Sequence, residues 1–209
     1  LLQSQVFFTG ETTVSEGILE VDSLVSGAVF VTGGTLKATG IISGDVIVEP
    51  NGVFIAGTET NTMTFGGTIL NDGFLEIKDS PGTFTNIAGD LILTTTSITN
   101  LDAILNVSGT VSLGGKLILE PPVGVIGSPG KILIQASDIT NEESFFNEVN
   151  AGAGVVSIFT LETLSDGTEV LYVNLSTRTV ADGGVVGDVG GVDLPGDINS
   201  NGVIDEEDV

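Results

Sequence analysis

The sequence of 209 residues contains no cysteine, no histidine and no tryptophan. Without cysteine the chain has no disulfides and no thiol chemistry, and without histidine it has no imidazole general base. The Cys and His ligands of zinc sites are missing as well. Together these absences exclude most familiar enzyme mechanisms.

Basic residues are scarce: five Lys and Arg stand against 28 Asp and Glu, which gives a formal net charge of −23. Such a surface disfavours binding to nucleic acid and to anionic membranes, because both would repel it. Divalent cations are its natural partners. Residues 1–10 show no initiator Met, no basic segment and no long apolar run, so we expect neither a signal peptide nor insertion into a membrane.

Short stretches of alternating apolar and polar residues run through the chain from Thr12 to Ser176. Examples are GILEV from Gly17, DVIVE from Asp45 and KLILE from Lys116. A period of two is typical of β-strands, whose side chains point alternately to opposite faces. Gly, Asn-Gly and Asp-Gly separate the stretches and supply the positive-φ residues that tight turns need. The sequence therefore predicts an all-β fold.

One pattern recurs at a nearly fixed interval, with GILEV at Gly17, GTLKA at Gly34 and GVFIA at Gly52. This even spacing indicates one coil of a solenoid per repeat and predicts a parallel β-helix. A β-sandwich, which also has short strands at regular spacing, is the alternative. Past Asn86 the interval becomes irregular, which predicts wider coils or a capping sheet. Because the ends of a β-helix expose unpaired edges, we expect residues 139–149 to cover one end as a short helix or loop.

Four stretches are similar to a known kind of repeat: LVSGAVFVTGGTLKATGIISGDVIVEPNGVFIAG, DSPGTFTNIAGDLIL, LNVSGTVSLGGKLILEPP and GSPGKILIQASDIT. Across Gly27 to Ser176 the chain resembles the autotransporter-associated β-strand repeats of passenger-type surface proteins. The resemblance implies a right-handed parallel β-helix in an exported protein, located outside the cell or on its surface. It also implies a role as a stalk, adhesin or surface coat, usually without catalysis.

Beyond the repeats the alternation fades, and residues 177–194 contain five Gly. We assign residues 1–176 to a β-helix domain, 177–194 to a Gly-rich linker and 195–209 to a calcium loop. A twelve-residue calcium loop needs side-chain oxygens at positions one, three, five, nine and twelve, Gly at six and a carbonyl at seven. The matching ligands are Asp197, Asn199, Asn201, Asp205 and Asp208, with the carbonyl of Val203 and with Gly202 at the turn. The sequence predicts a weak extracellular Ca²⁺ site, with a dissociation constant of roughly micromolar to millimolar.

Two details distinguish this loop from an EF-hand. Asp208 stands at the twelfth position, where EF-hands have Glu, and Pro195 and Gly196 preclude an entering helix. The loop resembles half of a type I dockerin, a module with two loop-helix units that docks onto cohesins. The resemblance implies calcium binding and a cohesin-like partner. The sequence contains one unit only, and Glu206 and Glu207 stand where cohesin-recognising dockerins often have small hydroxylated residues. The resemblance to dockerins therefore supports calcium binding by this chain more strongly than it supports recognition of a cohesin.

These patterns favour a non-catalytic structural or cell-surface protein: a fibre, stalk or surface-layer subunit that self-associates and whose C-terminal segment is stabilised by calcium. One alternative is an adhesin or glycan-binding module with a polysaccharide partner, which would lack Trp for stacking on sugar rings. The other is a dockerin-tagged β-helix enzyme that degrades polysaccharides, which needs a Lys or Arg base or a carboxylate pair in a groove. The five cations, Lys37, Lys78, Lys116, Lys131 and Arg178, lie far apart in sequence, although a site can form between coils. We therefore expect no enzymatic activity.

Overall fold

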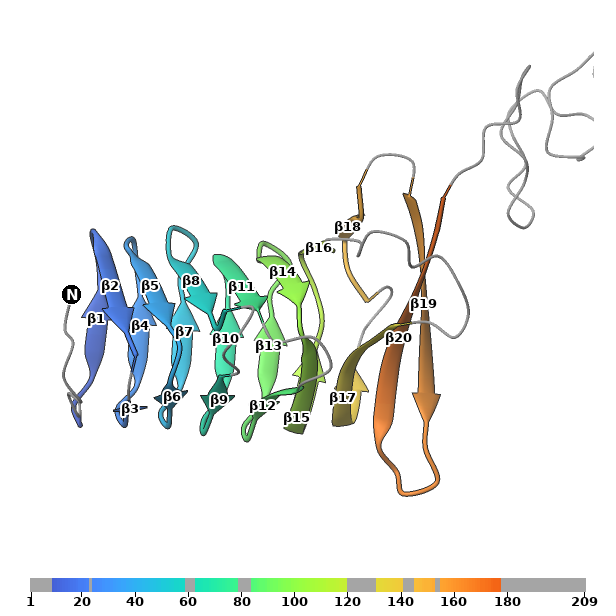
Figure 1. The fold of residues 1–209 in the computed structure, drawn as a ribbon, viewed down its shortest axis with the longest axis horizontal. Coiled ribbons are helices and arrows are strands. Elements are labelled where there is room, and N and C mark those ends of the chain that lie inside the picture. The colour runs from blue at the N-terminus through green and yellow to red at the C-terminus, as the bar shows by residue number, and fades with distance from the viewer. Residues whose placement is uncertain are drawn as a thin grey trace, which may run out of the picture.

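In the computed structural model the chain forms an elongated row of stacked β coils (Figure 1). The structure describes residues 9–22, 24–58, 63–78, 84–119, 131–140, 145–152 and 155–177. These residues form twenty strands and no helix, so none of them belongs to a helix that could cross a membrane. The predicted all-β fold and parallel β-solenoid are confirmed, and the β-sandwich is not the architecture.

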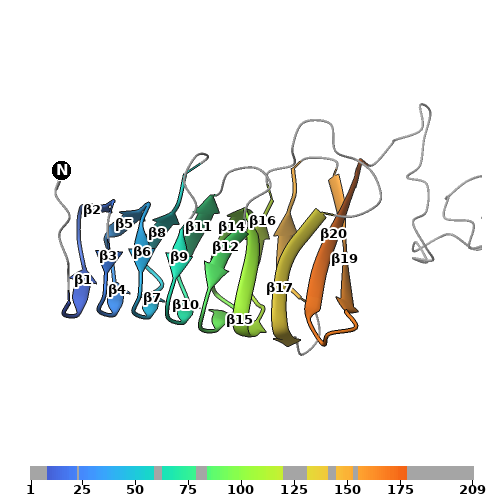
Figure 2. The same ribbon diagram turned by 60° about the horizontal axis from the view of Figure 1, so that its bottom comes forward.

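Each coil contributes one strand to each of three faces, and equivalent strands of successive coils pair in parallel (Figure 2). The first face holds β1 (Thr12–Val14), β4 (Val29–Val31), β7 (Val46–Val48), β10 (Ile69–Asn71) and β13 (Leu91–Leu93). The second face holds β2 (Ile18–Val21), β5 (Thr35–Ala38), β8 (Val53–Ala56), β11 (Phe74–Lys78), β14 (Ile98–Asp102), β16 (Lys116–Ile118) and β18 (Glu148–Asn150). The third face holds β3 (Leu24–Val25), β6 (Ile41–Ile42), β9 (Thr64–Phe65) and β12 (Phe84–Ile87). With β15 (Ile104–Ser112), about five coils are formed.

The long strand β15 belongs to two faces at once. Its first half pairs with β12 and its second half with β13, which joins the first and third faces into one thirteen-stranded sheet. The next strand, β17 (Lys131–Thr140), follows β15 in parallel, with a register shift between Val107 and Thr110. The corner between the two faces is therefore crossed by continuous strand at this end of the solenoid.

The predicted even repeat is confirmed in the first coils. On the first face Thr12 pairs with Val29 and Val29 with Val46, so each of these coils adds the same length of chain. The interval then widens earlier than predicted, because the next partner of Val46 is Ile69. The added residues lie between β8 and β9, which are further apart in sequence than β5 and β6. The prediction that irregularity starts past Asn86 was wrong on this point.

Alternation along each strand builds the core, since one set of side chains points into the solenoid and the other outward. Inward residues of successive coils stack in rows. One such row, on the second face, is Leu36, Phe54, Leu75 and Leu117, all buried, with Thr99 between the last two. Where the second and third faces meet inside, Phe54 and Phe65 pack edge to face with ring centroids 5.9 Å apart. A single apolar interior thus runs from coil to coil.

A buried asparagine interrupts one of these rows. Asn71 follows Val14, Val31 and Val48 in register and is fully buried. Its amide nitrogen donates to the hydroxyl of Thr99 at 3.2 Å, and its side-chain oxygen accepts from the backbone N–H of Gly73. Both ends of the amide therefore have partners, as burial of a polar group requires.

The corner between the third and first faces is formed by glycine in coil after coil. The members of this row are Gly27, Gly44, Gly67, Gly89 and Gly109. An added Cβ on Gly89 would lie 2.6 Å from the backbone of Gly67 and from the amide nitrogen of Thr68. Because backbone atoms of the adjacent coil fill the space, only glycine permits the coils to approach this closely at the corner.

The variant Gly89→Ala should lower the free energy of unfolding by about 1–3 kcal/mol, because its methyl group would force the coils apart at the corner. The matched control is Gly10→Ala. An added Cβ there meets nothing within 4 Å, so its effect should stay within about 0.5 kcal/mol. Chemical unfolding followed by circular dichroism measures both, and equal stabilities of the two variants would contradict the steric role of the corner.

Asp72 ties a turn to the next coil. It lies between β10 and β11, and its Oδ1 accepts hydrogen bonds from the hydroxyls of Thr94, at 2.6 Å, and Thr96. The bond from Thr94 and then that from Thr96 lower the pKa of the Asp72 carboxyl below its ordinary value of 3.8. The ionised carboxylate of Asp72 therefore stabilises the folded state relative to the unfolded chain.

The variant Asp72→Asn should be less stable than the native chain at neutral pH, with a difference that disappears in acid. A carboxyl whose pKa is lowered by folding stabilises the folded state above pH 3.8, and this contribution is lost as the pH falls below that value. Melting temperatures measured from about pH 7 to about pH 2 test this. Thr94→Val should weaken the same pH dependence, whereas a constant gap between native chain and Asp72→Asn would refute it.

The C-terminal end of the described solenoid is closed by antiparallel strands. β17 pairs in parallel with β15 on one edge and antiparallel with β20 (Glu169–Thr177) on the other, and β20 pairs with β19 (Val155–Thr163). This is the predicted capping sheet. Of the two forms predicted for the segment 139–149, a short helix or a loop, its described part contains no helix, and residues 145–147 are loop. Its last residues begin β18, and Phe145 and Phe146 pack on Phe159 of β19.

Candidate functional site

The predicted calcium ligands lie outside the described residues. They are Asp197, Asn199, Asn201, Val203, Asp205 and Asp208, and the predicted linker from residue 178 onward is outside as well. Within the described part of the chain, no group of three or more acidic side chains is placed to hold a metal ion. The calcium site therefore stays a prediction.

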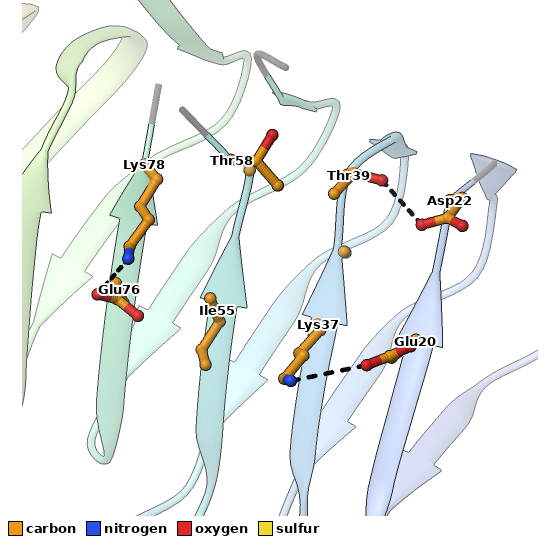
Figure 3. Close-up of a pocket in the computed structure, with 10 residues that line it drawn as sticks. Glu20, Asp22, Lys37, Thr39, Ile55, Thr58, Glu76 and Lys78 are labelled. Carbon is orange, nitrogen blue, oxygen red and sulfur yellow. Dashed lines mark hydrogen bonds and ion pairs between the residues drawn. The ribbon is translucent and has the colours of Figure 1, made fainter. Parts of the chain in front are cut away.

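The described residues contain an open groove of about 620 Å³ on the second face (Figure 3). It is lined by Glu20, Asp22, Lys37, Ala38, Thr39, Ile55, Gly57, Thr58, Glu76 and Lys78. These residues belong to β2, β5, β8 and β11 and the turns that follow them, one strand from each of the first four coils. The groove therefore runs along the solenoid axis, across the strands, and presents a similar set of positions at every coil.

Charged side chains in the groove lie in pairs. In register across the coils, Glu20 faces Lys37, and their Oε1 and Nζ atoms are 3.6 Å apart. Ile55 follows on the next strand, and beyond it Glu76 lies 3.3 Å from Lys78 on the same strand. The groove thus has an apolar middle flanked by two ion pairs.

Glu76 is the most enclosed of the paired carboxylates. Its side chain is 15% exposed, against 47% for Glu20. The Oε1 atom of Glu76 also accepts a hydrogen bond from the amide nitrogen of Asn100 at 3.2 Å. Asn100 is itself buried, and its Oδ1 has no hydrogen-bond partner among the residues that the structure describes. Glu76 and Asn100 therefore form the more polar and more enclosed end of this surface.

The three faces differ in chemistry. The second face holds three of the five cations, Lys37, Lys78 and Lys116, and Lys116 pairs with Glu148 at 2.5 Å. On the first face an outward, half-buried row of apolar side chains spans four coils: Phe30, Ile47, Leu70 and Ile92. On the third face Asn106 donates to the side-chain oxygen of Asn86 at 3.0 Å in an exposed amide row. Folding therefore places on one face three cations that are far apart in sequence, and Lys37 and Lys78 line the same groove. Lys131 is in β17, and Arg178 lies outside the described residues.

Sequence reasoning did not find the groove, although one signal was present. Glu20 and Lys37 are separated by the coil interval itself, because they are register partners on β2 and β5. Opposite charges at that interval predict a pair across coils. The partners of Glu76 carry no such signal, because the coils have already changed length there.

Several other carboxylates hold the backbone of a neighbouring coil. Asp45 accepts a hydrogen bond from the backbone N–H of Thr68 at 2.8 Å, and Asp90 accepts one from that of Thr110 at 2.7 Å. In the cap, Glu169 accepts from a backbone N–H of β17. Hydrogen bonds of this kind stabilise turns and strand ends, so these carboxylates have evident structural roles.

No family model matches the chain, and the comparisons found no matching curated protein and no matching solved structure.

Proposed function

We propose that the protein is a non-catalytic structural protein of the cell surface or extracellular space. It serves as a fibre, stalk or surface-layer subunit, and calcium orders its C-terminal segment for attachment to further subunits or to a cohesin-like partner. The observation that supports this role best is the single apolar interior that continues through about five stacked coils. Such a core makes the solenoid one stiff unit that separates its two ends.

The side-chain network supports the same role. Asp45, Asp72 and Asp90 each bind a neighbouring coil, and the glycine row sets close stacking along one corner. Contacts between adjacent coils therefore dominate, as in other repeat proteins, where stability is a sum of repeats and their interfaces. A protein built in this way holds its length without needing a second domain to brace it.

Calcium fits the charge of the chain. A net charge of −23 makes copies repel one another, and bound divalent cations would reduce that repulsion. The loop of residues 197–208 supplies three carboxylates, from Asp197, Asp205 and Asp208, for one site. Calcium would then act in two ways: it would lower the repulsion between acidic copies, and it would order the loop through which a copy attaches to its partner.

Electron microscopy and light scattering of the full chain, in millimolar calcium and in chelator, test the proposal. We expect ordered fibres or sheets with calcium that dissolve when it is removed. Titration should give one site with a dissociation constant of roughly micromolar to millimolar. The variant Asp197→Ala/Asp205→Ala should lose both effects, while Asp138→Ala, which removes an exposed acid on β17, should keep them. Monodisperse protein of unchanged order in both conditions would refute the calcium-linked assembly.

The groove favours a second candidate, a glycan-binding adhesin. Two ion pairs, Glu20 with Lys37 and Glu76 with Lys78, flank the apolar Ile55 along a line that an extended polysaccharide can follow. Polar groups placed around an apolar surface are typical of sites for small ligands and sugars.

Affinity electrophoresis in gels with neutral and acidic polysaccharides separates this candidate from the first. If the groove binds glycan, retardation should fall with Lys37→Met/Glu76→Gln and persist with Lys116→Met, which alters the same face outside the groove. Sugar release from the same polysaccharides should be absent. Release that depends on Glu76 would instead favour the polysaccharide-degrading enzyme.

A further inference from the structure

Among the described residues, the outermost strand of the cap, β19, has one edge that pairs with no other strand. It pairs with β20 through nine consecutive residues, from Val155 with Thr177 to Thr163 with Glu169, without any register shift. No other strand of the described residues pairs with β19. In Figure 1 it lies at the far end of the row of coils from the N-terminus. A row of backbone N–H and C=O groups is therefore presented at the C-terminal end of the described solenoid.

This edge lacks the features by which proteins usually block pairing with another strand. Such features are short strands, prolines, lysines and bulges. The sequence of β19, VVSIFTLET, contains no Pro, Gly, Lys or Arg and a single charge, Glu162. The neighbouring pair of β17 and β20 does have an irregularity, between Ile132 and Ile134, whereas the pair of β19 and β20 has none. β19 is thus long, regular and nearly uncharged.

Apolar side chains of β19 are incompletely buried on both faces of the sheet. Val155, Phe159 and Leu161 pack against the core, yet each is only partly buried. On the outward side Ile158 is 51% exposed. Another strand added at this edge would cover apolar surface on both sides of the sheet while its backbone groups completed the hydrogen bonds.

We propose that β19 pairs antiparallel with β19 of a second copy of this chain, joining two solenoids at their capped ends through one continuous sheet. Two identical edges form an antiparallel pair about a two-fold axis without any further element. Charge favours this arrangement over an in-register parallel pair, which would place Glu162 directly beside its own copy. In an antiparallel pair centred on Phe159, Glu162 instead faces Val156.

This inference rests on the proposed structural role and adds to it the surface through which two copies associate. The C-terminal end of the described solenoid presents an antiparallel strand, so we expect two copies to join there by strand pairing and not by stacking one coil on another. This pairing needs neither the loop of residues 197–208 nor calcium, so its test is separate from that of the proposed function.

Sedimentation velocity of the full chain over about a hundredfold range of concentration tests the proposal. We expect a monomer–dimer equilibrium in chelator, where the larger calcium-linked assemblies are dissolved. Ile158→Lys should raise the dissociation constant at least about tenfold, because it places two like charges close together on either side of the two-fold axis. Ile18→Lys is the matched control: this isoleucine is 65% exposed on β2, in the first coil, and its replacement should leave the dimer unchanged. A native chain that stays monomeric, or an association equally strong in both variants, would overturn the proposal.

Single cysteines give a second readout that does not depend on how well Ile158→Lys folds. Because the native chain has none, each can be introduced alone, at Val156, Ile158, Thr160 and Glu162 in turn, with Ile18→Cys as control. A short thiol-reactive cross-linker should join two copies most strongly at Ile158→Cys and Thr160→Cys, on either side of the two-fold axis, and less strongly at the two outer positions. Cross-linking no greater than in Ile18→Cys at any of the four would overturn the pairing. Dimers that persist in chelator, together with an absence of larger assemblies in millimolar calcium, would keep this inference and refute the calcium-linked function.

Discussion

Parallel backbone hydrogen bonding between coils is the constraint on which the rest of the structure depends. It holds equivalent strands about 4.8 Å apart, so every position of one coil lies directly above the same position of the coil before. The residue at each corner and in each row must therefore fit directly against the residue at the same position of the next coil. At the corner between the third and first faces this leaves room only for glycine. In the interior it aligns aliphatic and aromatic side chains, and on the second face it sets Glu20 beside Lys37.

Much of the fold is predictable from the sequence because this constraint makes residue types recur at the interval of one coil. The alternation of side chains identifies the strands, and the interval between Gly17, Gly34 and Gly52 identifies the coils. The widening at Ile69 is harder to foresee, since residues added to one turn leave the pairing of the flanking strands unchanged. Asn71 is also unpredictable, because its place in an aliphatic row depends on a partner, Thr99, in the next coil.

The two candidate sites also differ in how far the sequence predicts them. The calcium loop was predicted from consecutive residues, and it lies beyond the part of the chain that the structure describes. The groove escaped prediction because its residues come from four coils and its charges matter only once they are stacked. Glu76 illustrates the difficulty: Lys78 is near it in sequence, but Asn100, which encloses it, is contributed by the following coil. Local motifs are thus visible in a sequence, whereas surfaces assembled by stacking require the register.

The strand β15 has a mechanical consequence. In the first coils the third face is held by pairs as short as Leu24 with Ile41 and Val25 with Ile42. Around β15, by contrast, six register pairs with β17 extend over both faces, with one register shift between Val107 and Thr110. Hydrogen bonds between coils point along the long axis, so tension on that axis pulls directly on them. Resistance to such tension is therefore graded along the rod, and the coils nearest the N-terminus are the first to separate when the two ends are pulled apart.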